Sequence, residues 1–567
     1  MSLYLQIILK DESSSKPAPQ LCKNNHFMAI AIVKKFLRIS FFSRLSRPSR
    51  RQLSTSTVRR TSTSPQRCNV AAPALNASIK KFTDIPGPIA LPMMRHHAHV
   101  LPRIGSFHHT VGLGLLEGLR ERYGDLVRLA KASRSRPALY VFDPELMKEV
   151  YESNVTESPQ WVRSPLAEQR QNTGSDEIKA IWPAMRTLLQ DGALLSNYDQ
   201  VFDDIASDVT RRLAELRHAE NALNEEVETE VYRWAIETIG VMMFGIRLGC
   251  LDGAVHVPTE DNRKPEKTSM DDHIQDLCSL SKRPLEGMTP AEKFVRCSLE
   301  ISNESYLVRS ENTLKPESQS FNDALKAFDK HFSLTDQFLM KALNELNNDE
   351  LRPEQILLDK LRPLERRILP LAADVFLAGV DPLAQTAISM FYQLSLNAAR
   401  QQKAHDEVIW AKASREEGVD VQELPYISAC ARETLRLVPA TGGVVRRSNK
   451  GLVVGGYEVP AGVDIILAHG VSSKVEKEWG RAKSFIPERW CNESLGPLNA
   501  SRAHPTSSMP FGQTCPATGV VGKMLSSLAT RVLDKYRLEW HGPAPNMVTN
   551  GVNKIQSPYY FVLQNAG

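Results

Sequence analysis

The sequence predicts a mainly helical protein with a minor β-sheet, folded as a single large domain from residue 84 to residue 567. Three observations lead to this fold class. Apolar residues recur at helical spacing over long stretches, above all 321–348 and 365–400. Short strand-like runs are few and gather near 442–467. With 42% hydrophobic residues and no visible internal repeat, 567 residues can bury a large core.

A basic leader precedes this domain. Residues 28–83 contain twelve Lys or Arg and no Asp or Glu. This Arg- and Ser-rich, acid-free pattern is typical of a mitochondrial transit peptide, so we interpret 1–83 as a transit peptide and disordered leader, with Met28 as the functional start. A disordered basic tail is the alternative. The leader carries more positive charge than the whole chain, whose net charge is +5. Residues 28–83 contribute +12 and residues 1–27 contribute +1, so residues 84–567 carry −8. The folded part therefore gives no support to nucleic-acid binding.

The first elements of the domain follow a proline-rich hinge at 84–92. The stretch "GLLEGLRERYGDLVRL" predicts an amphipathic helix that stops at Gly124 and is followed by a strand. The stretch "PALYVFDPELMKEVYES" predicts a strand, a turn at Asp143-Pro144 and a helix. These short strands belong to the minor sheet.

The rest of the chain is mostly helical from about residue 178 onward. Residues 251–320 are polar with weak periodicity, and we place no element there. The long helices at 321–348 and 365–400 are followed by a helix that ends at Leu437 and by the short strands. A final helix is expected over 516–536.

Several site classes are excluded by spacing. Eight cysteines lie far apart with no CxxC pair, so we expect neither a disulfide framework nor a zinc site, and a reducing compartment fits best. The glycines of 112–118 lack the GxGxxG spacing of a dinucleotide loop. Five histidines between residues 96 and 109 lack acidic partners and are interpreted as surface residues. No run of 18 apolar residues occurs, so we expect no transmembrane helix, only peripheral contact with a membrane.

Two motifs place charged residues at short, regular spacing. "RETLRL" places Glu433 and Arg436 three residues apart on one helix face, and "FIPERW" supplies Arg489. An ExxR pair alone is usually an ordinary ion pair on a helix.

Three further features complete the pattern. "AIWPAMR" places Trp182 and Arg186 four apart on a helix, and "DVFLAGVDPLAQTA" is an apolar helix that contains Asp381. "HPTSSMPFGQTCPATGVVGKML" places Cys515 at the start of the final helix, before Pro516. A small buried residue is the alternative interpretation of Cys515.

In this order, the motifs resemble those of a cytochrome P-450 of the mitochondrial type. The resemblance covers the chain from Pro86 to the C-terminus and implies the cytochrome P-450 fold, a single large haem domain. It implies that the Cys515 thiolate ligates the iron of heme b, and a helix N-terminus favours such a thiolate. Trp182, Arg186 and Arg446, eleven residues before Tyr457, are then expected to bind the haem propionates.

The resemblance also implies roles for other residues. Asp381 and Thr386 are expected to help deliver protons, Glu433, Arg436 and Arg489 to hold the haem-facing core, and Val375, Phe376, Ala378 and Gly379 to form an apolar distal wall. Arg432 is expected to contact an adrenodoxin-like ferredoxin that supplies electrons. The implied reaction is insertion of one oxygen atom from O2 into a C–H bond of a small apolar substrate, such as a sterol or steroid, on the matrix side of the inner mitochondrial membrane. An invertebrate ecdysteroid-pathway hydroxylase fits this pattern.

The sequence departs from the family at three places. The family's loop reads FGxGxRxCxG, but Phe511 precedes Cys515 by only four residues, and Ala517 replaces the following glycine. Pro382 stands where a threonine is usual, with Thr386 one turn further on. Ser428 replaces one of two basic residues expected at the ferredoxin-binding surface.

These departures leave three interpretations open. The first is an active monooxygenase with a shortened cysteine loop. The second is a non-catalytic protein of the same fold. The third is a mis-spliced gene model with a damaged cysteine loop, with the junction near Gly512.

Overall fold

A computed structural model gives the fold of residues 79–88, 112–129, 136–153, 156–157, 175–223, 226–255, 286–309, 319–348, 350–417, 424–491, 496–513 and 515–566. All of these belong to one compact unit, which extends from Ser78 to Gly567. The leader, the histidine cluster and most of 251–320 lie outside the described residues.

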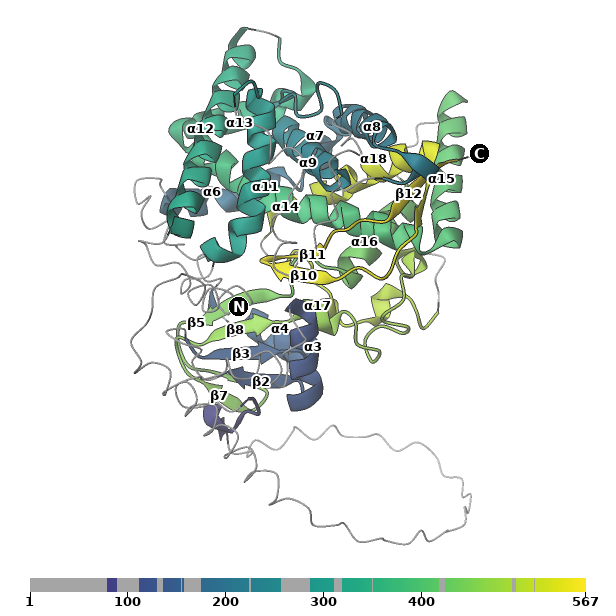
Figure 1. Cartoon of the computed structure of the whole chain (residues 1–567). Coiled ribbons are helices and arrows are strands. Elements are labelled where there is room, and N and C mark those ends of the chain that lie inside the picture. The colour runs from purple at the N-terminus through teal and green to yellow at the C-terminus, as the bar shows by residue number, and fades with distance from the viewer. Residues whose placement is uncertain are drawn as a thin grey trace, which may run out of the picture. The chain divides into compact units, whose positions relative to one another are not determined.

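Helices make up most of the described chain (Figure 1). They are α3 (Gly112–Tyr123), α4 (Pro144–Glu152), α6 (Ser175–Leu188), α7 (Gly192–Ser196), α8 (Asp199–Glu215), α9 (Val227–Phe244), α11 (Pro290–Arg309), α12 (Gln319–Asn348), α13 (Ile356–Leu361), α14 (Ile368–Ser395), α15 (Ala398–Glu416), α16 (Pro425–Leu437), α17 (His469–Ser472) and α18 (Val520–Lys535). Short 3₁₀ turns include η8 (Pro487–Trp490), η10 (Pro505–Ser507) and η11 (Pro516–Thr518).

The strands form small sheets. They are β1 (Lys80–Lys81), β2 (Leu126–Leu129), β3 (Ala138–Val141), β4 (Thr156–Glu157), β5 (Val444–Ser448), β6 (Leu452–Val454), β7 (Tyr457–Val459), β8 (Asp464–Leu467), β9 (Tyr536–Trp540), β10 (Met547–Asn550), β11 (Val552–Ile555) and β12 (Phe561–Asn565). The largest sheet has the order β2-β3-β8-β5-β4, in which only β3 and β8 are parallel. The mainly helical fold with a minor sheet is therefore confirmed.

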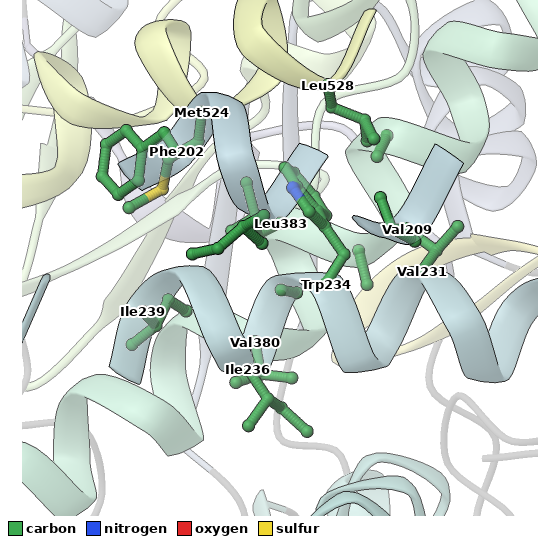
Figure 2. Close-up of a cluster of buried hydrophobic side chains, with 14 of the residues drawn as sticks. Phe202, Val209, Val231, Trp234, Ile236, Ile239, Val380, Leu383, Met524 and Leu528 are labelled. Atoms are coloured by element: carbon green, nitrogen blue, oxygen red, sulfur yellow. The ribbon is translucent and has the colours of Figure 1, made fainter. Parts of the chain in front are cut away.

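Four helices form the centre of the core. Helix α9 packs against α8 and α14, and α18 packs against α8. Every residue of α9 except Glu228 is buried. Figure 2 shows apolar side chains of these helices meeting around Trp234, which is 1% exposed. This core fixes α14, which carries Asp381 and Thr386, and α18, which follows the Cys515 turn.

Local sequence explains where individual elements begin and end. The Asp143 carboxylate caps α4 by accepting hydrogen bonds from the backbone N–H groups of Glu145 and Leu146. Helix α9 ends at Gly245, whose φ of 65° is left-handed. A Cβ at this position would also lie 2.7 Å from the Gln355 backbone, so only glycine fits.

Three expected boundaries differ in the structure. The ordered unit begins before residue 84, because β1 pairs in parallel with β7. The predicted helix over 365–400 is two helices, since Asn397 between them has non-helical backbone angles. The final helix ends at Lys535, and Tyr536 instead starts β9, paired with β12. For the two helices, a local break or tertiary pairing outweighs helical periodicity.

One helical stretch among the described residues, Pro353–Ser395, is long and apolar enough to cross a membrane. Just over half of its most apolar window (56%) is buried inside the protein, and it contains the core helix α14. The expected absence of a transmembrane helix stays a prediction.

Candidate functional site

The motif residues Glu433, Arg436 and Arg489 form one buried charge network. Glu433 and Arg436 are fully buried and Arg489 is 1% exposed. Arg436 donates two hydrogen bonds to the Glu433 carboxylate, of 2.9 and 2.8 Å, and Arg489 donates a third of 3.0 Å. The Ile486 N–H and the Trp490 indole N–H donate to the same carboxylate. All three charges are therefore paired, as the sequence predicts.

The network ties three chain segments together. Arg436 also donates to the carbonyls of Ser473 and Ala482, at 2.6 and 2.7 Å, and stacks over the Trp479 ring. Arg489 donates to the carbonyl of Arg481. Because one guanidinium satisfies several buried carbonyls at once, α16 and the loop that ends at η8 are fixed as a unit.

Cys515 lies at the entrance of a short turn rather than of the long helix. It occupies the N-cap position of η11, and α18 begins only at Val520. The side chain is half-buried. Gly512, three residues earlier, adopts a φ of 56°, so the shortened loop keeps one left-handed glycine. Ala517 lies within the 3₁₀ turn, where a side chain is tolerated.

Arg186 interacts electrostatically with Cys515. Helix α6 packs against η11, and the positive charge of Arg186 stabilises the ionised form of the Cys515 thiol. Burial raises the pKa of the Cys515 thiol, while the Ala517 N–H and the Arg186 charge lower it. The effect of burial is the largest, so the net pKa of Cys515 is raised. The surrounding protein groups therefore do not by themselves favour the thiolate that the sequence leads us to expect. Trp182 lies one turn before Arg186 and packs partly buried against the main core.

Arg446 lies on β5, opposite Ile465 of β8. Burial raises the pKa of Tyr151, and the Arg446 charge lowers it by a smaller amount. The Tyr151 hydroxyl lies 2.8 Å from Nε2 of His469. Nδ1 of His469 lies 2.7 Å from the Thr506 carbonyl and must donate to it, so Nε2 accepts from Tyr151. Burial lowers the pKa of His469 to about 4, which keeps the ring neutral.

One face of α14 remains accessible although the helix is largely buried. Asp374 and Ala378 are exposed and Pro382 is half-buried, at a spacing of four residues. Two members of the expected distal wall point elsewhere. Phe376 is 1% exposed and packs edge-on against Phe294 of α11, with the ring centroids 5.0 Å apart. A Cβ on Gly379 would lie 3.1 Å from Ile239 of α9.

Asp381 lies seven residues after Asp374 on the same side of α14, but there the helix is covered and Asp381 is buried in a polar cluster. Its carboxylate pairs with Nζ of Lys554 on β11 at 3.0 Å and accepts a short hydrogen bond from the Tyr232 hydroxyl. Tyr232 and Lys554 both also reach the hydroxyl of Ser302 on α11. Gln385 donates to Glu228 at 2.9 Å and extends the cluster along α14. Burial raises the pKa of Glu228.

Thr386 is buried and its hydroxyl is engaged within the helix. It donates to the Pro382 carbonyl at 2.7 Å. Pro382 has no N–H, so the helix lacks one backbone hydrogen bond at this point. Sequence reasoning brought Asp381 and Thr386 together on α14 but missed Tyr232 and Lys554, which come from α9 and β11.

Arg432 is exposed on α16, and its guanidinium lies 4.3 Å from the Trp490 ring centroid. Nearby, Glu488 of η8 binds Arg400 at 3.2 Å and Lys403 at 2.8 Å, both from α15. Partial burial acts to raise the pKa of Glu488, but the bond from Lys403 and the other polar contacts lower it to about 2. This surface therefore carries several fixed cations beside one ionised acid.

Comparison with known proteins decides the family. Residues 98–562 match the sequence pattern of the protein family described as Cytochrome P450. It belongs to the cytochrome P450 family. It is therefore a haem monooxygenase, and its cofactor is haem held by a cysteine thiolate.

Relatives and solved structures agree with this assignment. The chain is 25% identical to "Probable cytochrome P450 49a1" of Drosophila melanogaster, which covers 90% of this chain and 87% of that protein. It is 22% identical to "Probable cytochrome P450 12b2, mitochondrial" of the same organism, over 82% of this chain and 86% of that one. It is 26% identical to "25-hydroxyvitamin D-1 alpha hydroxylase, mitochondrial" of Rattus norvegicus, in an alignment that covers 58% of this chain and 63% of that protein.

The fold is that of a solved P450. The "Crystal structure of cytochrome P450DA heme domain" superposes with a TM-score of 0.62 and 15% identity, covering 85% of this chain and 97% of that chain.

The residues of this chain fit haem chemically. Among the described residues, no group of three or more His, Cys, Asp or Glu could hold a metal ion. Half-buried Cys515 offers a thiol, and Arg186 and Arg446 offer guanidinium groups suited to carboxylates. A single thiol together with cations for two propionates matches an iron porphyrin.

Proposed function

We propose that this P450 hydroxylates an apolar substrate, a sterol or steroid, with electrons from a ferredoxin in the mitochondrion. The observation that carries the proposal is the packing of α6, which holds Trp182 and Arg186, against the Cys515 turn, in a chain that also has a fully paired Glu433–Arg436–Arg489 network. When bound, haem supplies the activation of O2 and the insertion of one oxygen atom into a C–H bond.

Each motif residue has a role in this proposal. Cys515 would hold the haem iron through its thiolate, and the positive charge of Arg186 favours the ionised sulfur. Arg186 and Arg446 bind the propionates, with the Trp182 indole N–H as a further donor. The Glu433 network fixes α16 to the loop that ends at η8.

Asp381 and Thr386 are proposed to manage protons on the distal side. Lys554 pairs with the Asp381 carboxylate, which also accepts a hydrogen bond from the Tyr232 hydroxyl, so the carboxylate is held in place beside two polar partners. The Thr386 hydroxyl is held by the Pro382 carbonyl, so it serves only when this bond breaks. Because Pro382 has no hydroxyl that could pass on a proton, we expect proton delivery to be slow.

Electron supply is assigned to the α15–α16 surface. Arg432, Arg400 and Lys403 provide cations there, which suits an adrenodoxin-like acidic ferredoxin. Two relatives that carry "mitochondrial" in their names support this partner and location.

The leader fits the same location. Cleavage of a transit peptide must leave Lys80 and Lys81 in place, because β1 is part of the folded unit. We therefore propose cleavage before Lys80, slightly upstream of the boundary at Asp84 that composition suggests. Contact with the inner membrane is peripheral in this proposal, and the ecdysteroid pathway is a candidate source of the substrate.

The alternative is a non-catalytic protein of the same fold, and it rests on the shortened Cys515 loop. A mis-spliced gene would produce the same loop. The left-handed Gly512 and the placement of α6 against η11 favour a working site over both.

The test is the spectrum of the reduced protein under CO. Wild type should show the red-shifted Soret band of thiolate-ligated haem, and Cys515→Ala should lose it. Cys491→Ala, a half-buried cysteine away from the turn, is the matched control and should keep the band. Wild-type protein that takes up no haem would support the non-catalytic alternative.

A further inference from the structure

Helix α15 presents large apolar side chains to solvent. One side of this helix packs against α14, α16 and α18. On the other side Trp410 is 58% exposed and its neighbour Ile409 is 43% exposed. Tryptophan is enriched at the centres of protein interfaces, because its ring buries much apolar area with little loss of side-chain freedom. A tryptophan left this exposed beside an exposed isoleucine therefore indicates a contact surface.

Two opposite charges flank Trp410 at equal distances along α15. Lys403 lies seven residues before it, and Glu417, which caps the end of the helix, lies seven residues after it. Residues seven apart are on the same side of a helix, and seven residues span about 10.5 Å along its axis. Both charged side chains are exposed. The stripe Lys403–Trp410–Glu417 therefore places a cation, an aromatic ring and an anion in order along one side of α15.

This order is complementary to itself when one copy is reversed. If two α15 helices pack antiparallel about a two-fold axis at Trp410, Lys403 of each copy meets Glu417 of the other. The two Trp410 rings then meet at the axis, with Ile409 beside them. A parallel pair would instead bring like charges together at both ends, which is unfavourable. A two-fold contact uses the same patch on both copies and closes, so it produces a dimer rather than a filament.

The surroundings of the stripe are compatible with this arrangement. The Lys403 ammonium has three N–H donors, and one of them donates to Glu488 at 2.8 Å, so the same group can also meet an acid of a second copy. Asp406 lies on the same side of α15, and its carboxylate accepts a hydrogen bond of 2.9 Å from Gln402. Because it keeps this bond when the surface is covered, Asp406 costs less to desolvate than a carboxylate that loses all of its partners.

We propose that the Lys403–Trp410–Glu417 stripe binds a second copy of this chain, in antiparallel orientation about a two-fold axis at Trp410. This contact depends on neither the substrate nor the haem, and so it goes beyond the proposed function. It has one consequence for that function. Lys403 belongs to the cations assigned to the ferredoxin, so the ferredoxin and the second copy compete for the same side chain.

Sedimentation equilibrium of the full chain tests the proposal. Lys403→Glu and Glu417→Lys each place like charges at both ends of the antiparallel contact. In an equimolar mixture of the two variants, each end of a mixed dimer again joins an acid to a lysine. Trp410→Ala removes the central ring. Met340→Ala, at a residue of α12 that is 51% exposed, is the matched control for the loss of an exposed apolar side chain.

Wild type should form a dimer. Trp410→Ala should raise the dissociation constant of this dimer roughly 30-fold, the loss typical of a residue at the centre of an interface, and Met340→Ala should leave it unchanged. Each charge variant alone should dimerise roughly 10-fold more weakly, because two exposed ion pairs become repulsive. The mixture of the two charge variants should return to the affinity of wild type.

Wild type that stays monomeric up to its solubility limit would overturn the proposal, and so would a dimer that Trp410→Ala leaves unchanged. A mixture that associates no more tightly than the separate variants would rule out the antiparallel contact. Loss of the Glu488 bond in Lys403→Glu cannot imitate the expected result, because the same chain must associate again with Glu417→Lys. The CO spectrum of the haem reports on the proposed function separately, so the two failures are distinguishable.

Discussion

Replacing Arg436 by alanine tests whether the Glu433 network is a requirement of the fold. The substitution removes two hydrogen bonds to Glu433 and leaves the carbonyls of Ser473 and Ala482 without their donor. Breaking a buried ion pair by removing one partner costs about 3–5 kcal/mol. Native proteins are stable by only about 5–15 kcal/mol, so this loss is a large fraction of the total.

The same helix offers a matched control. Arg432 is one turn away but exposed, with a stacking contact to Trp490 that contributes about 0.5–1 kcal/mol. The urea concentration that removes half of the helical circular dichroism should fall sharply for Arg436→Ala and slightly for Arg432→Ala. Arg436→Lys should recover only part of the loss, because an ammonium lacks the planar fork. Similar midpoints for the two alanine variants would refute the reasoning.

Three further outcomes are expected. His469 has a folded pKa lowered to about 4, so the free energy of unfolding should fall by up to about 3 kcal/mol as pH drops from about 6.5 to 4, and His469→Phe should remove this dependence in urea titrations. Lys554→Met should cost about 3–5 kcal/mol by leaving Asp381 buried without its cation, and a thermal-unfolding double-mutant cycle with Asp381→Asn should show that the double variant recovers most of it. Arg432→Glu should raise the ferredoxin concentration needed for half-maximal turnover and flatten its salt dependence, with substrate binding unchanged; turnover indifferent to the reversal would place the docking surface elsewhere.

The sequence predicts those parts of the site that depend on short spacing. Glu433 and Arg436 are three residues apart on one helix, and helical geometry alone brings them together. Cys515 stands out because a proline and an apolar-periodic helix follow it. The family resemblance then orders these local features along the chain.

What the sequence does not predict depends on long-range contacts. Tyr232 lies 149 residues before its partner Asp381, and Lys554 comes from a hairpin near the C-terminus, so no local pattern connects them. The exposure of Asp374 depends on which helices cover α14. The break between α14 and α15 could have been predicted from Ser395 and Asn397, because Ser and Asn side chains compete for backbone hydrogen bonds. In the structure both side chains bond to carbonyls of the preceding turn.

The pairing of β1 with β7 constrains when this chain can finish folding. Lys80 pairs with Tyr457, so the first described strand waits for a partner made almost 400 residues later. Helix α18, which completes the central core against α8, is later still. Contacts this distant in sequence close slowly, because the loop entropy is lost before the pairing is gained. The β1–β7 pair can therefore form only after most of the chain has been synthesised.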